Sequence, residues 1–285
     1  MIIDKIYQYL NQEGKTLDET LRYEVEKLAG ASFKRQFMTE ENGVSKGSLR
    51  LSSAGKCARQ LAYKYHGIET KGKEIDARAK IIFFQGDLVE MMLASIAKLA
   101  GCNLVATGLH QALVKLTVGE NVINGHTDGL LIESGEIFLV EFKSMSSYAF
   151  ERFEKGFIDD SYIAQYTTYL EALNINRCVF VGLNKDNGVL HEMVIKRDPV
   201  IVDLARSNLL KVIQSTPDKL PERPYFPDEK GFYPWQCAYC PAYNTCLIET
   251  GLATRVVVKN AYKLKAIETK KEIKGENNAD PISKT

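Results

Sequence analysis

Two carboxylates in neighbouring apolar segments could bind a divalent cation, with a lysine beside them. Asp128 lies in "VINGHTDGLLIE", and Glu141 and Lys143 lie in "IFLVEFKS". Because side chains alternate along a strand, Glu141 and Lys143 share one face and Phe142 lies on the other. Buried unpaired charge is costly. Two charges in a strand that is apolar on both faces therefore need partners.

The expected hairpin brings a second carboxylate next to Glu141, and the pair then needs a cation. If the turn is the two residues 134–135, Glu133 pairs with Glu136 and Asp128 lies opposite Glu141. Such neighbours have Cβ atoms roughly 4.5–5.5 Å apart, so the two carboxylates repel unless a cation lies between them. Mg²⁺ prefers oxygen ligands of this kind. The alternative is a surface carboxylate pair with a lysine salt bridge, and a register shifted by two residues would separate the pair.

Two helical segments carry further candidates. Glu90 shares a helix face with Gly86 and Ala94, whose small side chains leave room around a carboxylate. The alternative is an ordinary glutamate on a helix surface. Gln165 and Tyr169 are one helical turn apart on one face. From periodicity alone, Tyr169 is a core residue.

The cysteines suggest a second metal centre. Three follow a C-x2-C-x5-C spacing near the C-terminus, and one further ligand is needed for a cage of four. Two of the other three occur in apolar settings, where unreactive buried thiols are common. Four thiolates would bind zinc as readily as an iron–sulfur cluster. The expected cage consists of Cys57, Cys237, Cys240 and Cys246, and the two excluded thiols are Cys102 and Cys178.

The composition is that of a globular protein and does not indicate any one class of binding partner. The chain has 285 residues, with 45% hydrophobic and 26% charged residues and a net charge of +1. No apolar run is long enough to cross a bilayer, and the N-terminus lacks a signal-peptide layout, so we expect an intracellular protein. Residues 56–80 carry seven basic and three acidic side chains. This local excess could meet a phosphate backbone or form a solvated helix face.

Periodicity and turn residues predict an α/β domain around one mixed sheet. The segment 33–50 is expected to be a loop, 217–234 a proline-rich linker, and 268–285 a frayed tail. The first helix, 15–29, has a capping-box pattern and a glycine at its end. A P-loop motif is absent from the sequence. Further helices are predicted at 57–67, 76–101, 146–157, 160–173 and 198–215, strands at 103–116, 121–132 and 136–144, and a hairpin at 177–196.

Asp128 followed by Glu141-Phe142-Lys143 resembles the motif of PD-(D/E)XK nucleases, with Thr127 in place of the usual proline. The resemblance implies that Asp128 and Glu141 bind a catalytic Mg²⁺ or Mn²⁺. It also implies that Lys143 positions or activates the attacking water. The expected fold is then a restriction-endonuclease-like core with a central mixed β-sheet flanked by helices.

Other motifs are similar to those of RecB-like members of that family. "GDLVE" places Glu90 where those nucleases have a metal-site histidine, and Gln165 and Tyr169 match their Q-x-x-x-Y motif. That match implies that Gln165 and Tyr169 line the active site. "GKCARQLAY" and the distant cysteine triplet resemble iron–sulfur RecB-like nucleases, including AddB-type domains and CRISPR-associated nucleases. The four predicted cage cysteines would then hold a [4Fe–4S] cluster that joins the chain ends.

The expected protein is a metal-dependent DNA exonuclease, with possible endonuclease side activity. Its DNA would be single-stranded or have free ends, and recombination, repair, CRISPR adaptation or a viral pathway could use it, with recombination or CRISPR proteins as partners. A cytoplasmic location is expected. The alternative is a non-catalytic DNA-binding or assembly factor with the same fold. Predicted phosphate contacts are Lys56, Arg59, Lys64 and Lys185.

The predicted division of the chain has three parts. Residues 1–50 form an N-terminal helical segment, 51–250 the nuclease core with its cluster, and 251–285 a basic tail.

Overall fold

The computed structural model describes residues 1–16, 18–38, 47–72, 77–258 and 261–267. The chain forms two compact units: Met1–Glu69 with Ile75–Glu222, and Thr70–Glu74 with Arg223–Thr285. The predicted ranges 1–50, 51–250 and 251–285 remain predictions, and the expected tail 268–285 lies outside the described residues. Among the described residues, no helix combines the length and apolarity needed to cross a membrane.

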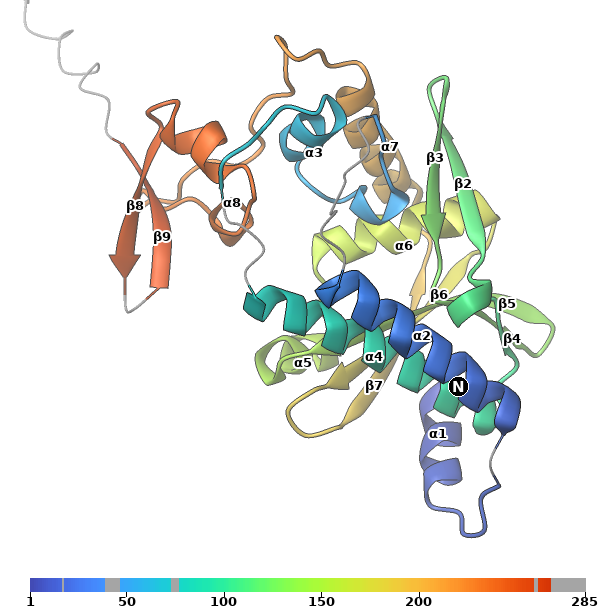
Figure 1. Cartoon of the computed structure of the whole chain (residues 1–285). Helices are drawn as coiled ribbons and strands as arrows, with labels where there is room; N and C mark the ends of the chain where they lie inside the picture. The colour runs from blue at the N-terminus through green and yellow to red at the C-terminus, as the bar shows by residue number, and fades with distance from the viewer. Residues whose placement is uncertain (17, 39–46, 73–76, 259–260, 268–285) are drawn as a thin grey trace, which may run out of the picture. The chain divides into compact units, whose positions relative to one another are not determined.

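The first unit is built on a five-stranded mixed sheet (Figure 1). β5 lies in its middle and runs parallel to β6, whereas every other neighbouring pair is antiparallel. The predicted α/β fold with a central mixed sheet is therefore confirmed, and it is consistent with a restriction-endonuclease-like core. In spatial order the strands are β1 (Leu104–Val105), β4 (Gly129–Glu133), β5 (Glu136–Met145), β6 (Arg177–Asn184) and β7 (Leu190–Lys196).

The β4–β5 hairpin has the predicted register. Glu133 pairs with Glu136 and Gly129 with Val140. The two turn residues, Ser134 and Gly135, have φ values of 53° and 78°. A tight turn with two positive φ angles matches the twist of the flanking strands. Asp128 directly precedes β4.

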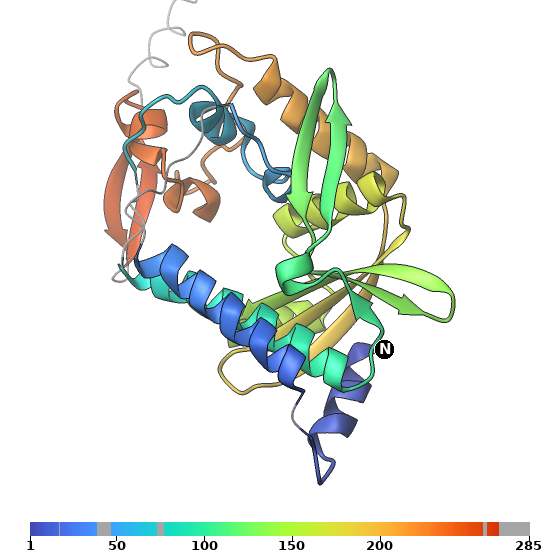
Figure 2. The same cartoon turned by 45° about the vertical axis from the view of Figure 1, so that its right-hand side comes forward.

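Helices cover both faces of the main sheet (Figures 1 and 2). Leu139 and Phe180 belong to one core, shared with α3, α6 and α7. Val140 and Phe142 belong to another, shared with α1 and α4. This alternation confirms that Glu141 and Phe142 face opposite ways. The helices are α1 (Ile2–Leu10), α2 (Glu19–Phe37), α3 (Ala58–Tyr65), α4 (Ala77–Leu99), α5 (Ser147–Glu154), α6 (Asp160–Leu173) and α7 (Pro199–Ile213).

Most predicted helices and the 177–196 hairpin are found, but the helix predicted at 15–29 has different ends. α2 starts after Asp18, whose carboxylate accepts a hydrogen bond from the Leu21 amide at 2.9 Å. It continues through Gly30 to Phe37, so the loop expected from residue 33 is wrong over 33–37. Packing against α4 overrides the local stop signal, since Phe37 contacts Phe84 with ring centroids 5.3 Å apart.

The segments predicted as single strands at 103–116 and 121–132 are each divided. The first contains β1, a 3₁₀ turn at Gly108–His110 and the start of β2 (Leu113–Val118). The second contains β3 (Asn121–His126) and β4. β2 and β3 form a separate two-stranded sheet, so the chain changes sheets at Thr127 and Asp128. Glycine permits this packing, because a Cβ on Gly125 would lie 2.5 Å from the Tyr169 ring.

The long helix α4 is exposed in its first part and buried in its second. Ile81, Ile82 and Phe83 are exposed, whereas Leu93, Ala94 and Ala97 are buried against the sheet. Apolar composition alone did not distinguish the two halves of α4.

The second unit has a small apolar core and a hairpin. α8 (Trp235–Ala238) and a π-helical turn (Asn244–Ile248) precede the antiparallel pair β8 (Ala253–Val258) and β9 (Ala261–Ala266). Tyr243, Leu247, Ala253 and Leu264 form the buried core.

Two glycine substitutions test the packing of the first unit. Gly125→Ala should destabilise the protein by about 1–3 kcal/mol, because the added methyl would meet Tyr169 and Leu51. Gly30→Ala has open space around it in α2 and should stabilise by about 0.5–1 kcal/mol. Chemical denaturation measures both. A destabilising Gly30→Ala would show that α2 does not continue through residue 30.

Candidate active site

Asp128, Glu141 and Lys143 meet on one face of the central strand. Asp128 and Glu141 are 9% and 1% exposed. The Lys143 ammonium forms a close ion pair with Glu141 Oε1 and lies 3.9 Å from Asp128 Oδ2. Asp128 Oδ2 also accepts a hydrogen bond from the Phe142 amide at 2.9 Å. The three predicted residues thus form one buried charged group.

α6 brings Gln165 and Tyr169 to this group. Gln165 Nε2 donates to Glu141 Oε1 at 2.9 Å. Tyr169 is 1% exposed, and its hydroxyl is hydrogen-bonded to Ser52. Gln165 therefore contacts a candidate ligand directly, whereas Tyr169 packs beneath the site. The predicted catalytic roles of both stay predictions.

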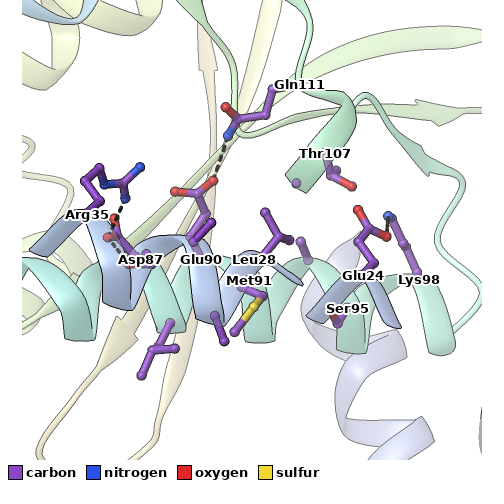
Figure 3. A pocket seen from close by; sticks show the side chains of 16 residues that line it. Glu24, Leu28, Arg35, Asp87, Glu90, Met91, Ser95, Lys98, Thr107 and Gln111 are labelled. Carbon is purple, nitrogen blue, oxygen red and sulfur yellow. Dashed lines mark hydrogen bonds and ion pairs between the residues drawn. The ribbon is translucent and has the colours of Figure 1, made fainter. Parts of the chain in front are cut away.

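Glu90 approaches from α4, which packs on the opposite face of the sheet. Its carboxylate interacts with the charges of Asp128, Lys143 and Glu141. Glu90 Oε1 accepts a hydrogen bond from Gln111 Nε2 at 2.9 Å, as Figure 3 shows. Glu90 also lines a pocket of about 310 Å³ between α2 and α4. The structure thus places Glu90 beside the two predicted metal ligands.

Burial makes the carboxyl groups of the site weaker acids than usual. It raises the pKa of Glu90 to about 8, and the nearby Asp128 charge adds to that rise. The pKa of Glu141 rises to about 7 for the same two reasons. Burial likewise raises the pKa of Asp128, against the opposing effect of Lys143. Burial alone would lower the pKa of Lys143, but Glu141 and Asp128 outweigh it and raise that pKa. The lysine therefore remains charged while the acids compete for protons.

The donor set suits a hard divalent cation. Oε2 of Glu141 is buried and has no hydrogen-bond partner among the described residues. A buried carboxylate oxygen without a partner is costly, and a cation would satisfy it. Oxygen ligands from Glu90, Asp128 and Glu141 match the preference of Mg²⁺. As they stand, the described His, Cys, Asp and Glu side chains include no cluster of three that could hold a metal ion.

Three residues of the site were not predicted. Gln111 holds Glu90, and Ser52 holds Tyr169. The Lys143 ammonium also lies 5.5 Å from the centre of the Tyr162 ring. Tyr162 precedes Gln165 by three residues on one helix face, and this spacing could have revealed it. Ser52 lies in a short 3₁₀ helix and Gln111 directly follows another, and neither position carries such a signal.

The predicted phosphate contacts have different surroundings. Lys56, Lys64 and Lys185 are exposed. Partial burial lowers the pKa of Lys64, and the positive charges of Arg50 and Lys56 lower it further. Lys64, Arg50 and Lys56 are therefore close together. Arg59 instead donates to the Pro221 carbonyl at 2.8 Å. Contacts with DNA stay predictions for all four residues.

The three C-terminal cysteines share the second unit. Cys237, Cys240 and Cys246 are half-buried and pack against its apolar core. The Ala242 amide donates to the Cys240 sulfur at 3.4 Å. Cys57 belongs to the first unit, where it precedes α3. Cys102 and Cys178 are buried in the two apolar cores of that unit, as expected for unreactive thiols.

Comparison with known proteins gives distant structural similarities. No family model matches the chain, and no curated protein matches it. The crystal structure of SSO0001 is 19% identical, with a TM-score of 0.46 over 76% of this chain and 92% of that one. An alkaline exonuclease (LHK-Exo) from Laribacter hongkongensis is 18% identical, with a TM-score of 0.40 over 67% and 92%. Its complex with dAMP gives 0.44 over 66% and 90%, also at 18% identity. These low TM-scores leave the chemistry of the site to be inferred from its own residues.

The raised pKa values predict a pH dependence of stability in metal-free protein. Glu90 and Glu141 titrate near pH 8 and 7 when folded, against an ordinary pKa of 4.5. Between pH 4.5 and these folded-state pKa values, the folded state therefore binds more protons than the unfolded state. The free energy of unfolding accordingly falls as pH rises. In EDTA, the melting temperature should decrease from pH 6 to pH 8.5.

The variant Glu90→Gln serves as the comparison for this measurement. Its amide does not titrate, so its melting temperature should decrease less over the same range. Equal slopes for both proteins would contradict a raised pKa at Glu90.

Proposed function

We propose that the protein is a metal-dependent DNA nuclease that hydrolyses phosphodiester bonds, with the PD-(D/E)XK type of site. The observation that supports this most strongly is the buried group of Asp128, Glu141 and Lys143, in which Glu141 Oε2 has no partner among the described residues. Glu90 adds a third carboxylate. Buried carboxylates that share one lysine are costly for stability, and a catalytic role explains their presence.

In this proposal Asp128, Glu141 and Glu90 hold Mg²⁺ or Mn²⁺. When bound, the ion would supply Lewis acidity toward a phosphate and would lower the pKa of the attacking water. Lys143 is fixed beside both carboxylates, where its charge stabilises negative charge that develops on the phosphate. Gln165 orients Glu141 through its hydrogen bond. Gln111 orients Glu90 in the same way.

The substrate proposed is DNA with free ends, and the activity is that of an exonuclease. Lys56 and Lys64 would contact phosphates, together with Lys185 and Arg59. We place the enzyme in the cytoplasm, in DNA end processing, recombination, repair or CRISPR adaptation. The support for these finer assignments is the motif order in the sequence.

Substitution of the lysine tests the proposed function. Wild-type protein should degrade end-labelled DNA with Mg²⁺ or Mn²⁺ and not in EDTA. Lys143→Ala should reduce the rate by at least about 100-fold, because it removes a charge aimed at the phosphate. Lys211→Ala removes an exposed lysine on α7 and should retain the wild-type rate. Inert wild-type protein that still binds DNA would instead indicate a non-catalytic DNA-binding factor.

We further propose that Cys57, Cys237, Cys240 and Cys246 hold a [4Fe–4S] cluster, with structural Zn²⁺ as the alternative. The support is the C-x2-C-x5-C spacing and the amide that donates to Cys240 Sγ. Amide donors of this kind stabilise metal-bound thiolates. The cluster would join the chain ends and need not take part in hydrolysis.

Metal analysis distinguishes these cysteines. Protein purified without oxygen should contain iron and absorb near ~400 nm. Cys237→Ser and Cys57→Ala should each lose most of the iron and melt at a lower temperature. Cys102→Ala removes a buried thiol and should keep its iron. Zinc without iron would favour the structural zinc site, and full iron in Cys57→Ala would exclude that residue.

A further inference from the structure

Three phenylalanines form an exposed aromatic cluster where the end of α2 lies beside the start of α4. Phe33 and Phe37 have ring centroids 5.1 Å apart. Phe84 lies 5.8 Å from the first and 5.3 Å from the second, with its ring tilted by 78° and 74°. Phe33 and Phe37 are nevertheless 48% and 42% exposed. Much of their ring surface therefore faces solvent.

Further apolar and basic side chains are exposed on the same two helix ends as this aromatic cluster. Met38, Ile81 and Phe83 are exposed on the same two helix ends. Lys34 and Arg78 are exposed as well. The nearby Asp87 carboxylate is already engaged, since it accepts from Arg35 at 2.6 Å and from Ser32 at 2.5 Å (Figure 3). An exposed apolar patch with basic neighbours is a feature of binding surfaces.

The aromatic cluster lies close to the proposed catalytic group along one helix. Phe84 precedes Glu90 by six residues of α4, a rise of about 9 Å. The pocket lined by Ser32, Arg35 and Glu90 begins on α4 at Asp87, three residues after Phe84. A strand that reaches Glu90 can therefore pass the aromatic cluster within one or two nucleotides.

We infer that Phe33, Phe37 and Phe84 stack on unpaired bases of the DNA strand that enters the site. This inference rests on the proposed function and names its substrate class: DNA with a single-stranded end. Aromatic rings bind bases of any sequence, and basic side chains beside them follow the backbone. Duplex DNA keeps its bases stacked on one another, so the aromatic cluster selects unpaired strands.

The surrounding charge favours DNA over a second copy of this chain as the occupant. Lys34 and Arg78, exposed on these two helix ends, would repel the same residues of a symmetric partner, because a two-fold interface brings like patches together. A polyanion meets no such repulsion. The chemistry of the surface thus matches a nucleic acid strand.

Fluorescence of a base analogue tests the stacking directly. A single-stranded oligonucleotide with 2-aminopurine near its end is titrated with protein in EDTA, so that no hydrolysis is needed. Wild-type protein should change the fluorescence as the analogue stacks on a ring. The triple variant F33L/F37L/F84L keeps apolar bulk but loses the aromatic faces. Its affinity should be at least about tenfold weaker, as expected for the loss of one or more stacked bases.

Two controls keep the outcome decisive. Tyr23→Leu removes an aromatic ring on the same helix that is 58% exposed, and it should bind like the wild type. If the triple variant melts at a lower temperature than the wild type, Phe33→Leu alone is compared, because that ring is half exposed. Equal binding by wild type and variants would overturn the inference. A change from dimer to monomer in the variant, seen by light scattering without a change in DNA binding, would also overturn it.

The nuclease assay separates this inference from the proposed function. If the protein hydrolyses DNA but the triple variant binds the 2-aminopurine oligonucleotide as the wild type does, the stacking inference is wrong and the proposed nuclease activity stands. If bases stack on the aromatic cluster but no metal-dependent hydrolysis occurs, the proposed nuclease activity is wrong and the surface still binds single-stranded DNA. If both proposals hold, the triple variant should lose activity on single-stranded ends more than on blunt duplex ends.

Discussion

The contact of Lys143 with Asp128 and Glu141 is the interaction on which the rest of the site depends. Two carboxylates buried in the middle of a sheet repel each other and lose their hydration. The ammonium of Lys143 offsets both costs by its ion pair with Glu141 and its position 3.9 Å from Asp128 Oδ2. The offset is incomplete, because the pKa of Glu141 still rises to about 7. Lys143 therefore balances only part of the negative charge of the two carboxylates.

The fold serves this group by bringing segments to it from both faces of the sheet. The two-residue turn at Ser134 and Gly135 sets the register that places Asp128 beside Glu141. α6 lies on one face and supplies Gln165. α4 lies on the other and supplies Glu90. The chain leaves the small β2–β3 sheet before Asp128 and joins the main sheet after it, so that residue sits at the start of a strand and its carboxylate can accept from the Phe142 amide.

The sequence predicted the parts of the site whose geometry follows from local rules. Alternation along β5 placed Glu141 and Lys143 on one face, and turn chemistry gave the register. Helical spacing correctly paired Gln165 with Tyr169 on α6, but Gln111 could not be found, because it follows an irregular turn and reaches Glu90 only through tertiary folding. The end of α2 was misplaced for a related reason: Gly30 is a local stop signal, and contacts with Phe84 on another helix override it. The break at Thr127 was missed because both halves of that segment have strand patterning.

The central claim is that Glu90, Asp128 and Glu141 bind a divalent cation next to Lys143. A crystal of the protein soaked with Mn²⁺, measured near the manganese absorption edge, locates the ion by its anomalous signal. We expect one strong peak within coordination distance of Asp128 and of Glu141 Oε2, the oxygen that has no hydrogen-bond partner among the described residues. Ordered manganese elsewhere, with Lys143 still paired to Glu141 and no peak at these carboxylates, would contradict the claim.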